Sequence, residues 1–249
     1  MEQKVKDKVG IITGATSGMG KAIALELAAH GAKLVLSGRD KSKGTQLAEQ
    51  LEHSVFVAGD ITQPAANETL VHTALEKFGK LDFLSLNAGI LGLGNVVDLS
   101  ISTWNKTLKT NLSSIFYLTK YALPFLSKNE GSSILINASI AAFKSFPNHP
   151  AYCASKAGAV GLMRQLAVDY APIRVNALCP GPVDTPLLWA SVKAFKNPEL
   201  AVENAKNATL LKKLGTPEDI AKMALFLLCG DSSWITGSEF TIDGGILNS

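Results

Sequence analysis

The sequence is poor in cysteine and has no cysteine pattern typical of a metal site or a disulfide framework. Its cysteines are Cys153, Cys179 and Cys229, an odd number without the spacing of zinc or redox motifs. A reducing compartment is the simplest interpretation of this usage. We therefore expect a cytoplasmic protein without a metal site.

The sequence also lacks long apolar runs and dense clusters of charge. Its longest apolar stretches, such as MALFLLC at residues 223–229, are too short to span a bilayer, and the N-terminal MEQKVKDKVG lacks the apolar core of a signal peptide. The net charge is only +3, and the basic residues are scattered. We therefore expect neither a membrane nor a nucleic-acid partner. Apolar residues make up 47% of the chain, which is enough for a large buried core.

Short β-branched runs alternate with segments in which apolar residues recur at helical spacing. The expected strands lie at residues 8–13, 32–37, 54–59, 81–87, 132–138, 173–179 and 239–243. The expected helices include residues 19–30, 64–78, 101–126 and 152–170. This alternation predicts βαβ units, and the continuously apolar strands predict a parallel sheet with helices on both faces.

We therefore expect one α/β domain over residues 1–249, a Rossmann-like doubly wound parallel sheet of about seven strands. The segment at about 184–213 interrupts the alternation and delays the last strand. Because insertions after the carboxyl ends of strands usually cover a ligand crevice, we expect this segment to cover the substrate.

The stretch GATSGMG, at residues 14–20, carries three glycines between an expected strand and an expected helix. Glycine weakens both kinds of element, so its repetition suggests that a ligand approaches the backbone closely. Backbone N–H groups at the start of a helix can hold a pyrophosphate. An ordinary strand-to-helix turn is the alternative, since spaced glycines alone are weak evidence.

The sequence YCASK places Tyr152 and Lys156 four residues apart, and hence on one face of an expected helix. A phenol has an ordinary pKa of about 10, and a nearby ammonium would lower that pKa. Tyr152 could then accept a proton from an alcohol or donate one to a ketone oxygen, with Ser139 hydrogen-bonded to the same oxygen. An incidental Tyr/Lys pair on a surface helix and a turn serine are the alternatives.

Together these motifs resemble the short-chain dehydrogenase/reductase family, in its single-domain form, over nearly the whole chain. TGATSGMG at residues 13–20 looks like the family's TGxxxGxG signature, and Ser139, Tyr152 and Lys156 match its catalytic set. The resemblance implies that Lys156 also binds the nicotinamide ribose. It adds Asn111, in KTNLSS, as a fourth catalytic residue that anchors a water linked to the lysine, although a satisfied core asparagine is the alternative.

The resemblance also implies a dinucleotide site that extends from the glycine turn to the catalytic residues. GDIT and LNAGI look like the motifs at the adenine ring and the adenosine ribose. CPGPVDT resembles the motif that meets the nicotinamide and implies transfer of the pro-S hydride. The residues matched in this way are Gly14, Thr16, Ser17, Gly18, Met19, Gly20, Asp60, Ile61, Asn87, Ala88, Gly89, Tyr152, Lys156, Pro180, Gly181, Val183 and Thr185.

The end of the second expected strand bears on the choice between NADP and NAD. In dinucleotide folds an acidic residue there holds the ribose 2′-OH, whereas an arginine accommodates a 2′-phosphate. The acidic position aligns with Gly38 here, and Arg39 follows it, with Ser37 and Lys41 as further contacts. This favours NADP over NAD. Asp40 could reach the ribose in a rotated loop, or could instead cap the following helix.

Residues 140–149 and 186–195 are expected to line the substrate pocket and to select a medium-sized, largely apolar ketone or secondary alcohol. His149 is either a polar handle in that pocket or a solvated loop residue. The apolar side chains expected there are Phe143, Phe146, Leu187, Leu188, Trp189 and Phe195.

Other functions remain open on the same scaffold. A 3-oxoacyl-thioester reductase is disfavoured, because Asn129 and Val168 stand where such enzymes dock an acidic carrier through arginine. A non-catalytic NADP(H)-binding regulator would not need the intact catalytic set, and a nucleotide-sugar epimerase expects a larger substrate domain. The resemblance further implies a homotetramer, or a homodimer, assembled in part through the C-terminal segment.

Overall fold

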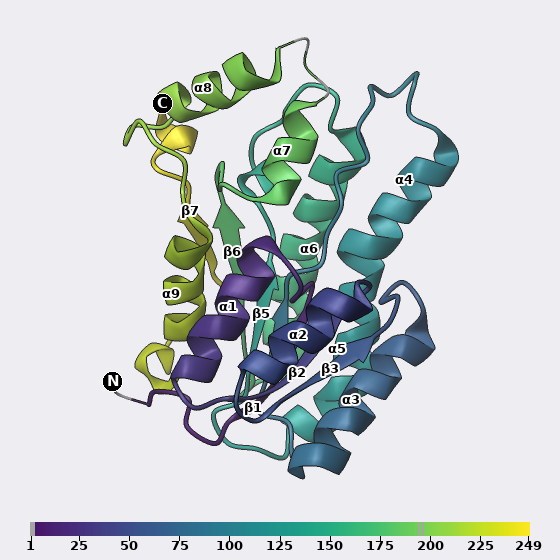
Figure 1. Ribbon diagram of the computed structural model, residues 1–249, viewed down its shortest axis with the longest axis vertical. Coiled ribbons are helices and arrows are strands. Elements are labelled where there is room, and N and C mark those ends of the chain that lie inside the picture. Colours follow the sequence, from purple (N-terminus) through teal and green to yellow (C-terminus); the bar gives the residue numbers. More distant parts are fainter. Residues whose placement is uncertain (1–2, 194, 196) are drawn as a thin grey trace.

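A parallel sheet with the strand order β3-β2-β1-β4-β5-β6-β7 forms the centre of the protein (Figure 1). The computed structural model describes residues 3–193, 195 and 197–249. Every neighbouring strand pair is parallel. The strands are β1 (Val9–Thr13), β2 (Lys33–Gly38), β3 (Ser54–Ala58), β4 (Phe83–Leu86), β5 (Ser133–Asn137), β6 (Arg174–Pro180) and β7 (Glu239–Ile242).

Helices cover both faces of this sheet, which is why its inner strands β1, β4, β5 and β6 are buried along their whole length. One core packs α3, α5 and α6 against the sheet, and the other packs α1, α2 and α9 against the opposite face. The helices are α1 (Gly18–Ala29), α2 (Lys41–Gln50), α3 (Pro64–Phe78), α4 (Ile101–Leu108), α5 (Ser114–Leu126), α6 (Pro150–Asp169), α7 (Pro186–Val192), α8 (Pro198–Ala208) and α9 (Pro217–Leu228).

The doubly wound α/β fold predicted from the sequence is confirmed. Each expected strand is present to within two residues at either end, and the helix expected at residues 64–78 has those bounds. The helix expected at residues 101–126 differs, because the π-helical turn η1 (Lys109–Ser113) joins α4 to α5. A π-helical turn adds one residue to a helical turn, and this change leaves the apolar pattern on both sides almost unaltered. The extent of the single domain stays a prediction.

The strand order determines where a ligand crevice opens at the edge of the sheet. The chain reverses its direction across the sheet between β1 and β4, so the turns that follow these strands diverge and leave a crevice at their carboxyl ends. The N-terminus of α1 faces that edge, and Figure 1 shows α7 and α8 beyond the end of β6. These two helices form most of the segment expected to cover the substrate. Ala194 and Lys196, between them, lie outside the described residues.

Among the described residues, no helix combines the length and the apolar character needed to cross a bilayer.

Candidate active site

The glycines of the turn after β1 allow the backbone of this turn to pack closely against α1 and against the loop after β4. Gly14 and Gly18 have φ values of +65° and +52°, in the left-handed region that favours glycine. At Gly20 a Cβ would lie 2.3 Å from the carbonyl oxygen of Gly14, so a larger residue would push the helix away from the turn. At Gly14 it would lie 3.0 Å from the backbone of Ala88. The space that these glycines free is therefore partly filled by the protein's own backbone.

A cavity of about 300 Å³ lies against this turn. Except for Lys41, it contains every residue that the sequence assigned to the pyrophosphate and adenosine parts of a dinucleotide. These are Gly14, Thr16, Ser17, Gly18, Met19, Gly20, Ser37, Arg39, Asp60, Ile61, Asn87, Ala88 and Gly89, together with Thr185. We call this space the nucleotide cavity.

Sequence analysis missed several residues of the nucleotide cavity, among them Lys106 of α4 and Thr110 of the π-helical turn. Their spacing of four residues on an expected helix put them on one face, but no motif marked that face. Thr62 and Ile90 also line the cavity from within the GDIT and LNAGI motifs, and Leu187, expected at the substrate, lines it together with Pro186.

At the end of β2, Arg39 is exposed and lines the nucleotide cavity, with Ser37 buried beside it. A Cβ at Gly38 would lie 2.7 Å from Thr16 Cγ2, so this position is closely packed. The carboxylate of Asp40 caps α2 by accepting the N–H of Lys43 at 3.0 Å. The capping alternative for Asp40 is therefore correct. Lys41 is the first residue of α2 and is not among the described residues that line the cavity.

Asp60 follows β3, and the pKa of its carboxyl is lowered. The N–H of Thr62 donates to its carboxylate at 3.0 Å. This hydrogen bond is the main cause that lowers the pKa of Asp60, and the positive charge of Arg39 lowers that pKa further. Asp60 and Arg39 thus lie on the same wall of the nucleotide cavity with opposite charges.

The expected catalytic residues converge at the carboxyl ends of β5 and β6. Tyr152 and Lys156 lie one turn apart on α6, and the Lys156 ammonium is 5.6 Å from the centre of the Tyr152 ring. The Lys156 Nζ donates to the carbonyl of Asn137, at the end of β5, over 2.7 Å. The Ser139 side chain hydrogen-bonds to the Tyr152 phenol. Ser139 Oγ also accepts the N–H of Ala141 at 3.1 Å, so it is a turn serine as well.

Burial changes both titratable groups of this pair. It raises the pKa of Tyr152 to about 12 and lowers the pKa of Lys156 to about 8. The Ser139 hydrogen bond acts in the opposite direction on the phenol, but its effect is smaller. The pKa of the phenol is therefore raised in the polypeptide by itself, and not lowered as expected, because loss of hydration outweighs the Ser139 hydrogen bond.

Asn111 lies in the π-helical turn and is almost completely buried. Its Oδ1 accepts the N–H of Ile90, and its Nδ2 donates to the carbonyl of the same residue, both at 2.8 Å. The Nδ2 also donates to Ser155 Oγ at 3.0 Å, and Ser155 in turn donates to the Tyr152 carbonyl at 2.7 Å. Asn111 is thus a satisfied core residue that is linked to the backbone of the catalytic helix.

Asn111 also lies close to Lys156. A Cβ built at Gly89 would lie 3.5 Å from Asn111 Oδ1 and 3.7 Å from Lys156 Nζ. The side chains of Asn111 and Lys156 therefore both approach Gly89. The water that the resemblance places between them stays a prediction.

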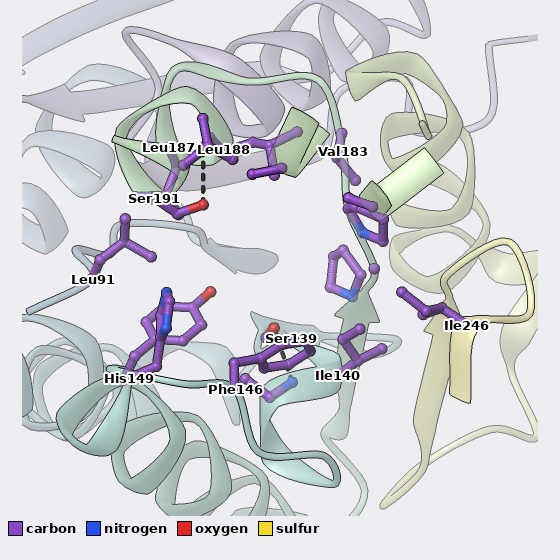
Figure 2. Close-up of a pocket in the computed structure, with 18 of the residues that line it drawn as sticks. Leu91, Ser139, Ile140, Phe146, His149, Val183, Leu187, Leu188, Ser191 and Ile246 are labelled. Carbon is purple, nitrogen blue, oxygen red and sulfur yellow. Dashed lines mark hydrogen bonds between the residues drawn. The ribbon is translucent and has the colours of Figure 1, made fainter. Parts of the chain in front are cut away.

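A second, larger cavity of about 640 Å³ opens above Ser139 and Tyr152 (Figure 2). We call it the apolar cavity, because most of its lining side chains are hydrocarbon. It shares Met19, Thr185 and Leu187 with the nucleotide cavity, so the two spaces adjoin. Pro180, Gly181 and Val183, which were expected at the nicotinamide, line it as well.

The expected substrate-pocket residues fall into two groups. Those that line the apolar cavity are Phe146, His149, Leu187, Leu188 and Phe195. Phe143 and Trp189 do not line it and are 48% and 44% exposed, and the Trp189 indole donates to Asp184 instead.

His149 is only 8% exposed, with Nδ1 2.6 Å from the Pro147 carbonyl and its ring edge-on to Tyr152. The solvated-loop alternative for this histidine is therefore wrong.

The known proteins that this chain resembles are described as oxidoreductases, dehydrogenases or reductases. A family model described as enoyl-(acyl carrier protein) reductase matches residues 14–247. An uncharacterized oxidoreductase of Thermotoga maritima is 39% identical, and the match covers 96% of each chain. Cyclohexanol dehydrogenase of an Acinetobacter species is 34% identical, over 98% of this chain and 96% of that one. The ligand-free aldohexose dehydrogenase of Thermoplasma acidophilum has a TM-score of 0.92 at 28% identity, over 100% of this chain and 97% of the other.

Proposed function

The chain belongs to the short-chain dehydrogenase/reductase family and is an oxidoreductase, and on that premise we propose that it transfers a hydride between NADP(H) and a largely apolar ketone or secondary alcohol. The observation that carries this proposal is the meeting of the nucleotide cavity and the apolar cavity beside Ser139 and Tyr152. A proton donor thus adjoins both the expected cofactor and the expected substrate.

The nucleotide cavity fits a dinucleotide in two respects. Ser17 stands at the N-cap of α1, yet its side chain makes no capping hydrogen bond. The first N–H groups of α1 are therefore available to a phosphate. Asn87 lines the same cavity, and its buried Oδ1 has no hydrogen-bond partner among the described residues. This amide oxygen is suited to accept a bond from a ribose hydroxyl.

The preference for NADP rests on the end of β2. Arg39 offers a planar, permanently charged group to a 2′-phosphate, and Ser37 offers a hydroxyl beside it. Gly38 supplies no carboxylate at the position where one would hold the 2′-OH of NAD. Asp40 is the nearest carboxylate in the sequence, and it is held at the cap of α2. These contacts favour the phosphorylated cofactor.

Proton transfer falls to Tyr152. A bound dinucleotide would supply the hydride chemistry, and the protein orients the reacting oxygen between the Ser139 and Tyr152 hydroxyls. Because burial raises the pKa of Tyr152 to about 12, the phenol is protonated near neutrality and can donate its proton to the oxygen of a ketone undergoing reduction. Lys156, held by the Asn137 carbonyl, supplies positive charge near the phenolate that remains. Alcohol oxidation reverses these steps.

The lining of the apolar cavity favours hydrocarbon substrates. Leu187, Leu188, Phe146 and Phe195 contribute aliphatic and aromatic surface, which cannot hydrogen-bond the hydroxyl groups of a sugar. Two relatives, cyclohexanol dehydrogenase and trans-4-hydroxycyclohexanecarboxylate dehydrogenase, are named for alicyclic alcohols. We therefore place alicyclic and similar apolar alcohols ahead of aldohexoses.

The runner-up functions receive less support. Asn129 donates to the Leu81 carbonyl at 2.8 Å, so it holds a loop rather than an acidic carrier protein. A purely regulatory role would not require Ser139 and Tyr152 to line the apolar cavity with the Lys156 ammonium 5.6 Å from the Tyr152 ring.

For assembly we propose a homotetramer, with a homodimer as the alternative. Phe116 of α5 and Val168 of α6 expose large apolar surfaces that an interface would cover. Light scattering on the purified protein measures the assembly directly.

One assay tests the proposed function. A panel of cyclic and open-chain ketones and secondary alcohols is offered with NADPH, NADH and their oxidised forms, and reduced nicotinamide is followed by its absorbance. We expect turnover with alicyclic ketones and a higher kcat/KM with NADPH than with NADH. Cofactor binding without turnover across the panel would favour the regulatory role instead.

A further inference from the structure

The apolar cavity contains one positive charge and no negative charge among the described residues that line it. Lys144, in the loop after β5, supplies the positive charge. Asn197 and Asn204 line the cavity on the side of α8, and they carry amide donors without charge. An ammonium group at the wall of a mostly hydrocarbon space suits a ligand that is itself apolar at one end and anionic at the other.

Lys144 is held in place at both ends. Its backbone N–H donates to the Ile140 carbonyl at 2.9 Å, and its Nζ donates to the Ile246 carbonyl at 3.3 Å. Ile246 lines the same cavity. An ammonium has three N–H donors, so this bond leaves others for a ligand.

The tail that carries Ile246 is itself fixed. The carboxylate of Asp243 accepts the N–H of Gly245 at 2.8 Å and the N–H of Leu247 at 3.0 Å. Asp243 is the nearest carboxylate along this tail, and it is not among the described residues that line the apolar cavity. Its oxygens are occupied by the backbone, so it does not take the place of an anionic ligand at Lys144.

The anchored ammonium lies away from the reacting hydroxyl. Figure 2 shows Ile246 on the opposite side of the cavity from Leu91 and His149. His149 packs edge-on against Tyr152, with ring centres 6.2 Å apart, so Tyr152 belongs to the His149 side. A substrate that bridges the two sides would have its carbonyl or carbinol at Tyr152 and its other end near Lys144.

We propose that the substrate is a keto acid or hydroxy acid, in which an apolar body separates the reacting carbon from a carboxylate that Lys144 binds. This inference rests on the proposed function, because it names the substrate class of the same site. A carboxylate is favoured over a neutral polar group, since an ammonium forms a charge-assisted hydrogen bond with it.

The test uses open-chain keto acids and their methyl esters, which have nearly the same shape but no charge. Each pair carries a methyl ketone at one end, and the methylene chain between the two ends is lengthened step by step. We expect the wild-type protein to prefer the acid at one chain length, with a higher kcat/KM than for the matched ester. The preferred length then reports the distance between Tyr152 and Lys144.

Lys144→Met should reduce the ratio of kcat/KM for acid over ester by about tenfold, mainly through KM, because a charge-assisted hydrogen bond is lost. Lys144→Arg should restore most of that ratio. The matched control is Lys120→Met, which removes an exposed lysine of α5 outside the cavity and should leave the ratio at the wild-type value. High salt should lower the ratio in the wild-type protein and not in Lys144→Met.

Equal ratios in the wild-type protein and Lys144→Met would overturn the inference, even if ketones are reduced well. A lack of turnover with every ketone would overturn the proposed function instead. In that case a binding measurement decides the role of Lys144. Octanoate should raise the midpoint of thermal unfolding of the wild-type protein more than 1-octanol does, and this difference should disappear in Lys144→Met. Equal stabilisation by the two probes would overturn the inference.

Discussion

The nucleotide cavity and the apolar cavity adjoin, but they are built from different parts of the polypeptide. The nucleotide cavity is lined mainly by the glycine turn, the end of β2 and the loops after β3 and β4. The apolar cavity is formed largely by side chains from the loop after β5, from α7 and α8, and from the C-terminal tail. Short motifs mark most of the first cavity, whereas in the second they mark the reacting residues and the turn after β6 but not α7 or α8.

This difference reflects what each ligand requires. Backbone N–H groups can bind phosphates only where side chains are small and φ values are unusual, so the same residue types recur at fixed spacing. An apolar substrate can be enclosed by many combinations of aliphatic and aromatic residues. Substrate preference should therefore change readily by substitution in α7 and α8, while cofactor binding should not.

The largest expected effect lies where the two cavities meet. Tyr152→Phe removes the proton donor and should lower kcat by about 10²- to 10⁴-fold. NADPH should still bind as it does to the wild-type protein, as measured by nicotinamide fluorescence, because the nucleotide cavity is untouched. Tyr170→Phe, an exposed tyrosine after α6, is the matched control and should keep full activity. Comparable turnover by Tyr152→Phe would disprove the role assigned to the phenol.

A second prediction concerns the pH dependence of stability. The pKa of Lys156 is lowered from 10.5 to about 8, so between pH 8 and 10.5 the unfolded chain binds more protons than the folded one. The contribution of Lys156 to stability should therefore rise with pH across this window, by on the order of 3 kcal/mol. Lys156→Met should lose this rise when urea unfolding is measured at several pH values. An identical pH profile for both proteins would contradict the buried, poorly hydrated ammonium.

The Tyr152 phenol should produce the opposite slope at higher pH. Its folded pKa of about 12 exceeds the ordinary value of 10.0, so the folded protein binds more protons than the unfolded chain between these values. Stability should therefore fall as the pH rises through this range. Tyr152→Phe should weaken that fall, which separates the tyrosine contribution from that of Lys156.

A third prediction compares two glycines, one in the glycine turn and one outside it. Gly20→Ala would place a Cβ 2.3 Å from a backbone oxygen and should destabilise the fold by about 1–3 kcal/mol while weakening NADPH binding. Gly161→Ala on α6 meets no atom within 4 Å and should stabilise the helix by about 0.5–1 kcal/mol. Urea unfolding measures both, and similar effects would show that the glycine turn tolerates side chains.

A further prediction concerns the choice of cofactor. Arg39→Met should weaken NADPH binding by about tenfold while changing NADH little, because an exposed arginine contributes only modestly to binding a phosphate. Lys41→Met is the matched control, since Lys41 does not line the nucleotide cavity. Fluorescence titration with both cofactors gives the comparison. Equal losses of NADPH and NADH in Arg39→Met would disprove the phosphate contact.

Most of the fold was predictable because its signals are local. Strand β1, the turn after it and α1 follow from residue types within twenty positions of one another. The π-helical turn was not predictable, because inserting one residue within a buried helix disturbs the apolar spacing too little. Asn111 could be chosen from the family motif, but its bonds to Ile90 and Ser155 depend on that turn.

The sequence predicted where most site residues lie, but it did not predict how burial changes their pKa values. The positions of Ser139, Tyr152 and Lys156 followed from their spacing. The direction of the phenol pKa did not, because it depends on how completely the surrounding elements remove water. The exclusion of Phe143 and Trp189 from the apolar cavity was also hidden, since an aromatic residue has the same periodicity whether it faces a ligand or solvent.

By itself the sequence determined the alternation of strands and helices, the glycine turn and the residue types that could move a proton. These depend on backbone preferences and on spacing of a few residues. Only the tertiary structure decided that Asp40 caps a helix rather than facing the cavity, that His149 packs on Tyr152, and that Lys144 reaches the C-terminal tail. Lys144 and Ile246 are distant in the chain. Asp40 and His149 each contact a residue three positions away, but which of their alternatives is realised depends on burial and packing that no local pattern encodes.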